Sequence, residues 1–248
     1  MILALIGDPH GNLDGLLELV ERAAKAGAGA ALALGDIGFN EAVLGHGRPL
    51  PHFPIPVLAP DGNHDDQAFL RRAQASQLTT TWAQHGLCFQ ARGSVLRFAG
   101  QHIGFVGGAW HVDRPQGPEN SISQQDVAVA IAAFRRHRPS ILATHSCPCR
   151  IGIGMQGSQR LTLQANQYLV AAGLDCGPTD DLGESALLEL WQQLPVKPKL
   201  WAFGHFHRPH YRRLGDTDFC CLPDISHAHA MRYWDMDTQT LLPLEPSE

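Results

Sequence analysis

Short apolar runs of strand length recur along this chain, and five of them give way to a polar turn in the same manner. Each of the five is followed, two residues after its end, by Asp or His. The runs are residues 2–6, 30–34, 55–59, 141–143 and 200–203. A strand that is apolar throughout is typical of a sheet covered on both faces. This recurring feature therefore predicts an α/β protein, and it constrains the fold more than any other part of the sequence.

The segments between these runs predict how the strands are connected. After the first run, apolar residues recur at helical spacing behind a capping residue, Asn12; they are Leu13, Leu16, Leu17, Val20 and Ala24. Strand–helix–strand order predicts parallel neighbours joined by right-handed crossovers. The ends of such strands meet at one edge of a sheet, where open α/β sheets bind ligands.

The rest of the chain predicts shorter elements. We expect helices near residues 123–137 and 187–194, and closing strands near 211–214, 218–222 and 231–236. Three short strands, at 87–91, 95–98 and 102–106, are separated by glycine-containing turns. Such spacing favours antiparallel strands or a second sheet. No linker interrupts the pattern, so we expect a single domain over residues 1–248.

Composition limits the class of protein. With 44% hydrophobic and 17% charged residues in 248, the chain has ample material for a core, and a net charge of −5 argues against a globally basic nucleic-acid surface. The longest uncharged apolar stretch, residues 127–134, is far shorter than a membrane span. The chain starts without a basic signal-peptide region, and its six cysteines form no CxxC pair. We therefore expect a cytoplasmic protein with free thiols.

The polar turns that follow the strands share a chemistry. In order they are Gly7-Asp8-Pro9-His10, Gly35-Asp36, Gly62-Asn63-His64-Asp65, Thr144-His145 and Gly204-His205-Phe206-His207. Each alone is typical of a turn, a helix cap or a surface loop. Gathered at one edge, so many Asp and His side chains would be unfavourable without a cation to bind them. Histidine is the commonest metal ligand among side chains, and the chain has 14.

This succession of motifs, D-x-H, G-D, G-N-H-[DE], H and G-H-x-H within residues 7–207, resembles the calcineurin-like metallophosphoesterases. The resemblance implies a four-layer α/β/β/α sandwich, in which helices flank two mixed β-sheets and two metal ions lie at the strand ends. It also implies two ligand sets. Asp8, His10 and His207 would hold one metal, Asn63, His145 and His205 would hold the other, and Asp36 would bridge the two ions.

The resemblance further implies hydrolysis of a phosphomonoester or phosphodiester by in-line attack of a metal-bridging hydroxide. Two cations acidify a shared water and stabilise phosphoryl charge. His64 is then the candidate general acid, and Asn63 and His111 are candidate substrate contacts. Imidazole and carboxylate ligands suit Mn, Fe, Zn or Co; we expect Mn, with Fe, Zn, Co or Ni as alternatives. We expect a small substrate such as a nucleotide, in preference to long nucleic acid.

Two positions depart from the pattern of the protein serine/threonine phosphatases. Where that branch has a second Asp and a phosphate-binding Arg, this chain has Phe39 and Asn40. The protein phosphatase function therefore loses support, and the residue that orients His64 stays open between Asp65 and Asp66. Residues 146–181 are rich in Gly and polar groups, and we expect them to form a lid or a substrate-specificity segment.

Two other functions were weighed against phosphoester hydrolysis. Residues 152–157 match G-x-G-x-x-G and Asp175 follows, as in a dinucleotide site, but in that fold the first Gly comes directly after the strand. A non-catalytic scaffold of the same fold, acting through protein partners, is the second alternative. Such scaffolds are expected to lose ligands, whereas every ligand position and His64 are present here. The sequence therefore favours an enzyme.

Overall fold

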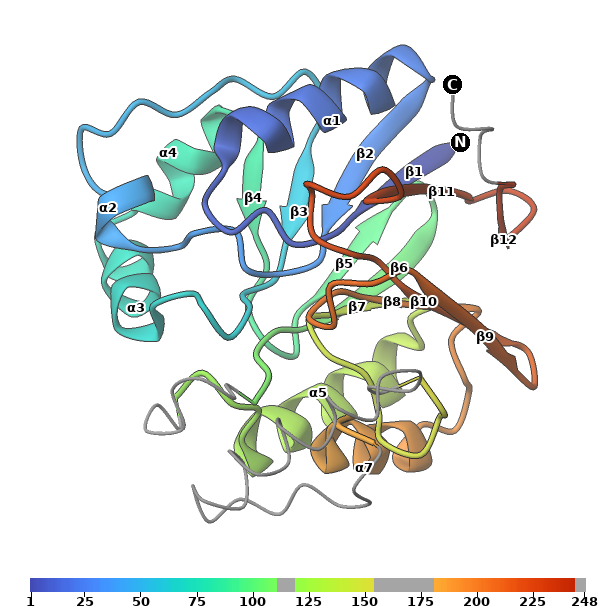
Figure 1. The fold of residues 1–248 in the computed structure, drawn as a ribbon. Helices are drawn as coiled ribbons and strands as arrows, with labels where there is room; N and C mark the ends of the chain where they lie inside the picture. Colours follow the sequence, from blue (N-terminus) through green and yellow to red (C-terminus); the bar gives the residue numbers. More distant parts are fainter. Residues whose placement is uncertain (111–118, 154–180, 244–248) are drawn as a thin grey trace.

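Two six-stranded β-sheets form the centre of the computed structural model, which describes residues 1–110, 119–153 and 181–243 (Figure 1). The strand order in the first sheet is β12-β11-β1-β2-β3-β4. Its strands are β1 (Ile2–Ile6), β2 (Ala28–Ala33), β3 (Val57–Ala59), β4 (Leu87–Phe89), β11 (Met231–Asp235) and β12 (Thr240–Leu241). Strands β1 to β4 are parallel, and β11 and β12 pair in antiparallel fashion at the side of β1.

The second sheet has the strand order β5-β6-β7-β8-β10-β9. Its strands are β5 (Val95–Phe98), β6 (Gln101–Val106), β7 (Ile141–Thr144), β8 (Leu200–Phe203), β9 (His210–Leu214) and β10 (Thr217–Cys221). Strands β6, β7, β8 and β10 are parallel, and the edge strands β5 and β9 are antiparallel to their neighbours. Both sheets are therefore mixed; the parallel strands are central in the second sheet, whereas in the first they extend from β1 to the edge strand β4.

Alternation along each strand explains why the two sheets stack. In β1, Leu3 and Leu5 belong to the apolar layer between the sheets, whereas Ala4 and Ile6 face the helices. The same period of two places residues of β7 and β8 on both faces of the second sheet. Three apolar layers result, one between the sheets and one under each group of helices, and they confirm the four-layer α/β/β/α sandwich.

Helices cover the outer face of each sheet (Figure 1). Beside the first sheet lie α1 (Leu13–Lys25), α2 (Glu41–Leu44), α3 (Gln67–Ala75) and α4 (Leu78–Gln84), and beside the second lie α5 (Gln124–His137) and α7 (Ser185–Gln193). Asn12 caps α1 as expected, since its side chain accepts the Gly15 N–H at 3.0 Å. No helix in the described ranges has both the length and the apolar character needed to cross a bilayer.

The structure changes two expectations. The five polar turns do not share a sheet: β1, β2 and β3 end in the first sheet, and β7 and β8 end in the second. Residues 87–89 pair in parallel with β3 in the first sheet, so only β5 and β6 form the expected antiparallel hairpin. Both differences have one cause, because periodicity identifies a strand but not the sheet that it joins.

Candidate metal centre

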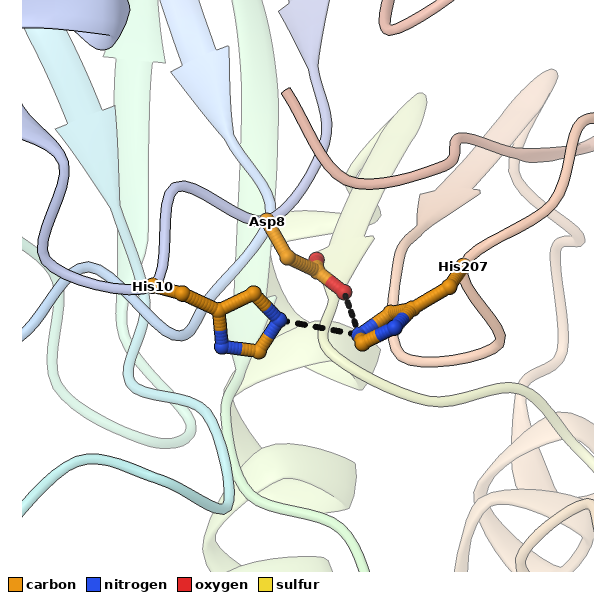
Figure 2. A group of neighbouring side chains, drawn as sticks. All are labelled: Asp8, His10 and His207. Carbon is orange, nitrogen blue, oxygen red and sulfur yellow. Dashed lines mark hydrogen bonds and ion pairs between the residues drawn. The ribbon is translucent and has the colours of Figure 1, made fainter. Parts of the chain in front are cut away.

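The first group of predicted ligands, which we name cluster 1, consists of Asp8, His10 and His207. Asp8 and His10 follow β1, and His207 follows β8 on the opposite sheet (Figure 2). The Nε2 atoms of His10 and His207 lie 2.9 Å apart, and His207 Nε2 lies 3.5 Å from Asp8 Oδ2. One ligand atom from each residue lies within 4.8 Å of the others, an arrangement that can hold a metal ion.

The second group, cluster 2, consists of Asn63, His145 and His205 and is assembled around one amide oxygen. Asn63 Oδ1 lies 2.9 Å from His145 Nε2 and 3.1 Å from His205 Nδ1. His145 Nδ1 lies 2.8 Å from the carbonyl oxygen of Leu34, which can only accept a hydrogen bond. Nδ1 therefore carries a proton, and the opposite ring nitrogen faces the cluster.

Asp36 lies between the two clusters, but only one of its oxygens faces both. Asp36 Oδ2 is 3.6 Å from His10 Nδ1 and 3.3 Å from His145 Nε2. The other oxygen, Oδ1, accepts the backbone N–H of His64 at 2.8 Å. The resemblance implies that Asp36 bridges the two ions, and the geometry offers a single oxygen, Oδ2, to both sides.

Two buried oxygens show that these residues fit a cation. Asp8 Oδ1 and Asp36 Oδ2 are buried and have no hydrogen-bond partner in the described part of the chain. A buried carboxylate oxygen without a partner is costly unless a positive charge compensates it. The donor set around these atoms is imidazole nitrogen, carboxylate oxygen and amide oxygen, which suits first-row divalent metals.

In the metal-free protein, burial and the close approach of Asp8, Asp36 and His145 shift the pKa values of these side chains. Burial raises the pKa of Asp8 to about 8, although His145 opposes this shift. Burial would lower the pKa of His145, but the carboxylates of Asp36 and Asp8 outweigh it and raise that pKa to about 10. Burial also acts against ionisation of Asp36, yet His145 holds the pKa of that carboxyl well below its usual range.

Four of the nine non-glycine residues with positive φ in the described part of the chain are predicted ligands. His10, Asp36, His205 and His207 adopt φ values of 48°, 51°, 68° and 49°, in the left-handed region that non-glycine residues rarely enter. Strained residues of this kind persist where the surrounding structure fixes them, and they gather at functional sites. The turns after β1, β2 and β8 therefore have the strained backbone conformations that are common at functional sites.

Glycines in the motifs provide the room in which the ligands meet. A Cβ on Gly35 would lie 2.3 Å from His145 Nδ1, one on Gly62 would lie 2.0 Å from Asp36 Oδ1, and one on Gly204 would lie 1.9 Å from Asp8 Oδ1. No side chain fits at such distances, so each glycine lets a ligand from another turn approach. The sequence motifs indicate turns at these glycines but not the side chains that approach them.

The surroundings of His64 answer part of the question that the sequence left open. The Asp65 carboxylate accepts backbone N–H groups from Ile37, Gly38, Phe39 and Gly62, at 3.3, 2.8, 2.7 and 2.8 Å, and so ties the turn after β2 to the turn after β3. Asp66 caps α3 by accepting the Phe69 N–H at 2.9 Å. The backbone of His64 is held by Asp36, as described above. The motif G-N-H-[DE] contained the signal for Asp65, but its partners could not be read from it.

The two departures from the phosphatase pattern have structural roles. Phe39 is fully buried and stacks on Trp82 with ring centroids 5.3 Å apart. Asn40 caps α2 by accepting the Val43 N–H at 3.0 Å. At these positions the chain has a core residue and a helix cap in place of charged groups.

Some predicted residues cannot be placed. His111, most of the specificity segment (residues 154–180) and Asp175 of the dinucleotide alternative lie outside the described residues. Glu184, which the sequence did not single out, lies just after that segment; it is buried, and its Oε1 accepts the Trp110 N–H at 2.8 Å.

Two stacked mixed sheets with a centre of Asp, Asn and His at the ends of their parallel strands define the class of metal-dependent phosphoesterases. The model of the calcineurin-like phosphoesterase family matches residues 1–209, and the chain belongs to this family of hydrolases that act on phosphoric esters. The family uses a dinuclear metal centre, and clusters 1 and 2 with Asp36 provide candidate residues for it.

Solved structures of similar fold agree with this assignment. The protein TT1561 of Thermus thermophilus is 14% identical, with a TM-score of 0.58 over 97% of this chain and 96% of that one. A dimetal phosphatase from Danio rerio is 12% identical, with a TM-score of 0.56 over 94% and 91%. Phosphopantetheinyl hydrolase from Mycobacterium tuberculosis is 15% identical, with a TM-score of 0.51 over 96% and 97%. At these identities the likeness concerns the fold alone. No curated protein matches the chain by sequence.

Proposed function

We propose that this chain hydrolyses a small phosphomonoester or phosphodiester, such as a nucleotide, at a centre of two metal ions. One observation carries the proposal: Asp36 Oδ2 is buried, has no hydrogen-bond partner among the described residues, and lies 3.6 Å from His10 Nδ1 in cluster 1 and 3.3 Å from His145 Nε2 in cluster 2. The dimetal phosphatase from Danio rerio shares this fold.

The proposed ligands are those of the two clusters. Asp8, His10 and His207 hold one ion, Asn63, His145 and His205 hold the other, and Asp36 bridges them through Oδ2. Support comes from the convergence of these donor atoms and from the absence of thiolates among them. We propose Mn as the first metal to test, with Fe, Zn, Co and Ni as alternatives.

When bound, the two ions acidify a water and neutralise charge on the phosphoryl group. The residues of the chain orient this chemistry. The Nδ1–H of His145 donates to the Leu34 carbonyl and thereby fixes the direction of Nε2. Asn63, whose Oδ1 lies within cluster 2, is the proposed contact to both an ion and the substrate.

His64 is the proposed general acid. The backbone N–H of His64 donates to Asp36 Oδ1, and His64 is exposed. The ring centroids of His64 and His10 lie 5.2 Å apart. An exposed imidazole beside cluster 1 can donate a ring proton to the oxygen of a leaving alcohol. His111 remains a proposed substrate contact.

Three further proposals concern the whole chain. Residues 1–248 form one domain, with substrate specificity assigned to residues 146–181. Asn40 in place of an arginine supports a small phosphoester over a phosphoprotein as substrate. A cytoplasmic location stays a prediction; among the described cysteines, Cys88, Cys149, Cys220 and Cys221 are free.

The test starts from metal-stripped protein. Addition of Mn should restore hydrolysis of p-nitrophenyl phosphate, of bis-(p-nitrophenyl) phosphate or of both, with two ions per chain by elemental analysis. His64→Gln should lower the rate by about 10²–10⁴-fold, while His46→Gln, an exposed histidine in the loop after α2, should leave it unchanged. A protein that binds no metal and stays inert would favour the scaffold alternative instead.

A further inference from the structure

A buried arginine connects the end of the first sheet to the loops beside cluster 2. Arg92 follows β4, and its side chain is only 11% exposed. Its Nε and Nη2 donate to Asp61 Oδ2 at 3.0 and 2.6 Å. Asp61 is itself buried and lies two residues before Asn63 in the turn after β3. A forked contact of this kind fixes orientation as well as distance.

The same guanidinium binds the segment that leads into α5. Nη1 donates to the Ser121 carbonyl at 2.7 Å and to Asp126 at 3.1 Å, and Nη2 donates to the Asn120 carbonyl at 3.3 Å. Asn120 in turn donates from Nδ2 to the backbone carbonyl of Asn63 at 2.7 Å. Arg92 therefore reaches Asn63 by two routes, through Asp61 along the chain and through Asn120 across it.

The end of the second sheet is tied into this network. After β6, the Gly108 N–H donates to the Asp61 carbonyl at 3.0 Å, and the Ala109 N–H donates to the Asn120 carbonyl at 3.1 Å. A Cβ on Gly107 would lie 2.1 Å from Asp61 Oδ1, so the two loops are in close contact. The network thus joins the two sheets on the side where Asn63 meets His145 and His205.

We infer that Arg92 is a positioning residue for cluster 2: through Asp61 and Asn120 it holds Asn63 Oδ1 against His145 and His205, and it sets the metal affinity of that cluster. The inference rests on the ligand sets of the proposed function. Cluster 1 provides the contrast: the hydrogen bonds of Arg92 and Asn120 lead to the turn that holds Asn63 of cluster 2, whereas Asp8 and His10 of cluster 1 follow β1. Changes to the network should therefore weaken one of the two metal sites and spare the other.

The experiment titrates metal-stripped protein with Co²⁺ and follows the two binding steps by the absorption of the bound ion. Asn120→Ala and Arg92→Met should each weaken one step by about 10–100-fold and leave the other unchanged. Arg92→Lys should lose less metal affinity than Arg92→Met, since it keeps the positive charge but lacks the guanidinium group that donates several hydrogen bonds. Repeating the titrations in a His207→Ala background, which disables cluster 1, assigns the weakened step to cluster 2.

A matched control separates positioning from general loss of stability. Phe134→Leu removes buried volume on α5, in the apolar layer under the second sheet, without changing the network. It should leave both Co²⁺ affinities unchanged. Asn120 is only partly buried, so its variant keeps the test valid if Arg92→Met does not fold.

The results distinguish failure of the inference from failure of the function. A wild-type protein that binds fewer than two Co²⁺ ions would overturn the proposed centre and the inference with it. A wild type that binds two, with an Asn120→Ala variant of unchanged affinities, would overturn the inference alone. Equal weakening of both steps, or the same weakening in Phe134→Leu, would also overturn it.

Discussion

Clusters 1 and 2 contain similar side chains but lie in different environments. In cluster 1, the side chains of His10 and His207 are 32% and 47% exposed. In cluster 2, Asn63 and His145 are buried, and hydrogen-bond distances join their polar atoms to one another and to the Leu34 carbonyl. The two histidines of cluster 1 are partly open to water, whereas Asn63 and His145 of cluster 2 are fixed in the protein interior.

This difference implies that the two clusters differ in metal affinity and in access for a substrate. A site whose ligands are already oriented by hydrogen bonds loses less freedom when a metal binds. We therefore expect cluster 2 to bind its metal ion with higher affinity than cluster 1. Cluster 1, with its exposed imidazoles and His64 nearby, is the side on which a substrate can approach.

The largest effect should come from the residue that the clusters share. Asp36→Asn removes the negative charge that faces both sides, so activity should fall on the order of 10³-fold or more, with metal content reduced at both clusters. Activity assays and elemental analysis of the same sample measure this. Asp14→Asn, at an exposed position on α1, is the control and should behave as wild type. Retention of two ions and full activity by Asp36→Asn would remove its bridging role.

Two histidine variants test the comparison directly. His205→Ala and His207→Ala should each lower activity by about 100-fold or more, because each removes one ligand. Their metal content after dialysis should differ: His207→Ala keeps one ion in the buried cluster 2, and His205→Ala keeps less. If both variants retain the same amount of metal after dialysis, the two clusters do not differ in metal affinity.

A larger residue at Gly35 should displace His145 and so disrupt cluster 2. Gly35→Ala places a Cβ 2.3 Å from His145 Nδ1, so the free energy of unfolding should fall by about 4 kcal/mol or more. Gly47 also has a positive φ, but a Cβ there would meet nothing within 4 Å. Gly47→Ala should therefore cost only about 1–2 kcal/mol for the left-handed backbone. Urea unfolding of both variants, without metal, measures the contrast; equal losses would argue against the predicted collision.

The smallest effect concerns Glu184, beside the loops of cluster 2. Burial raises its pKa from 4.5 to about 7, although the Trp110 N–H opposes the shift. The folded protein then binds this proton more tightly than the unfolded chain. The contribution of Glu184 to stability is therefore fully present below pH 4.5, falls as the pH rises to 7, and amounts to about 3 kcal/mol at most.

The measurement compares wild type with Glu184→Gln, which keeps the shape of the side chain but does not titrate. Urea unfolding in the presence of a chelator should show that the stability of wild type relative to the variant declines between pH 5 and pH 7. A constant difference over this range would mean that Glu184 has an ordinary pKa in the folded protein.

Much of this fold could be read from the sequence because its signals are local. The apolar run at residues 2–6 is β1, Asn12 caps the helix that follows, and Ser123 caps α5 in a capping box. The apolar pattern did not predict α3 or α4; α4 has only 7 residues and no side-chain cap bond. The order of Asp, Asn and His after the strands indicated the family, and the match over residues 1–209 confirmed it.

The sequence by itself determined which side chains end the strands, because strand period, turn residues and motif order act over a few neighbouring positions. Only the tertiary structure decided how they meet. It placed the ends of two sheets face to face, turned one oxygen of Asp36 toward both clusters, and gave Asp65 and Arg92 partners on distant loops. Those contacts join residues 26 to 34 positions apart, as for Asp65 with Phe39 and Arg92 with Asp126, and up to 197 apart, as for His10 with His207. Such distances are fixed by the packing of layers, which no local pattern encodes.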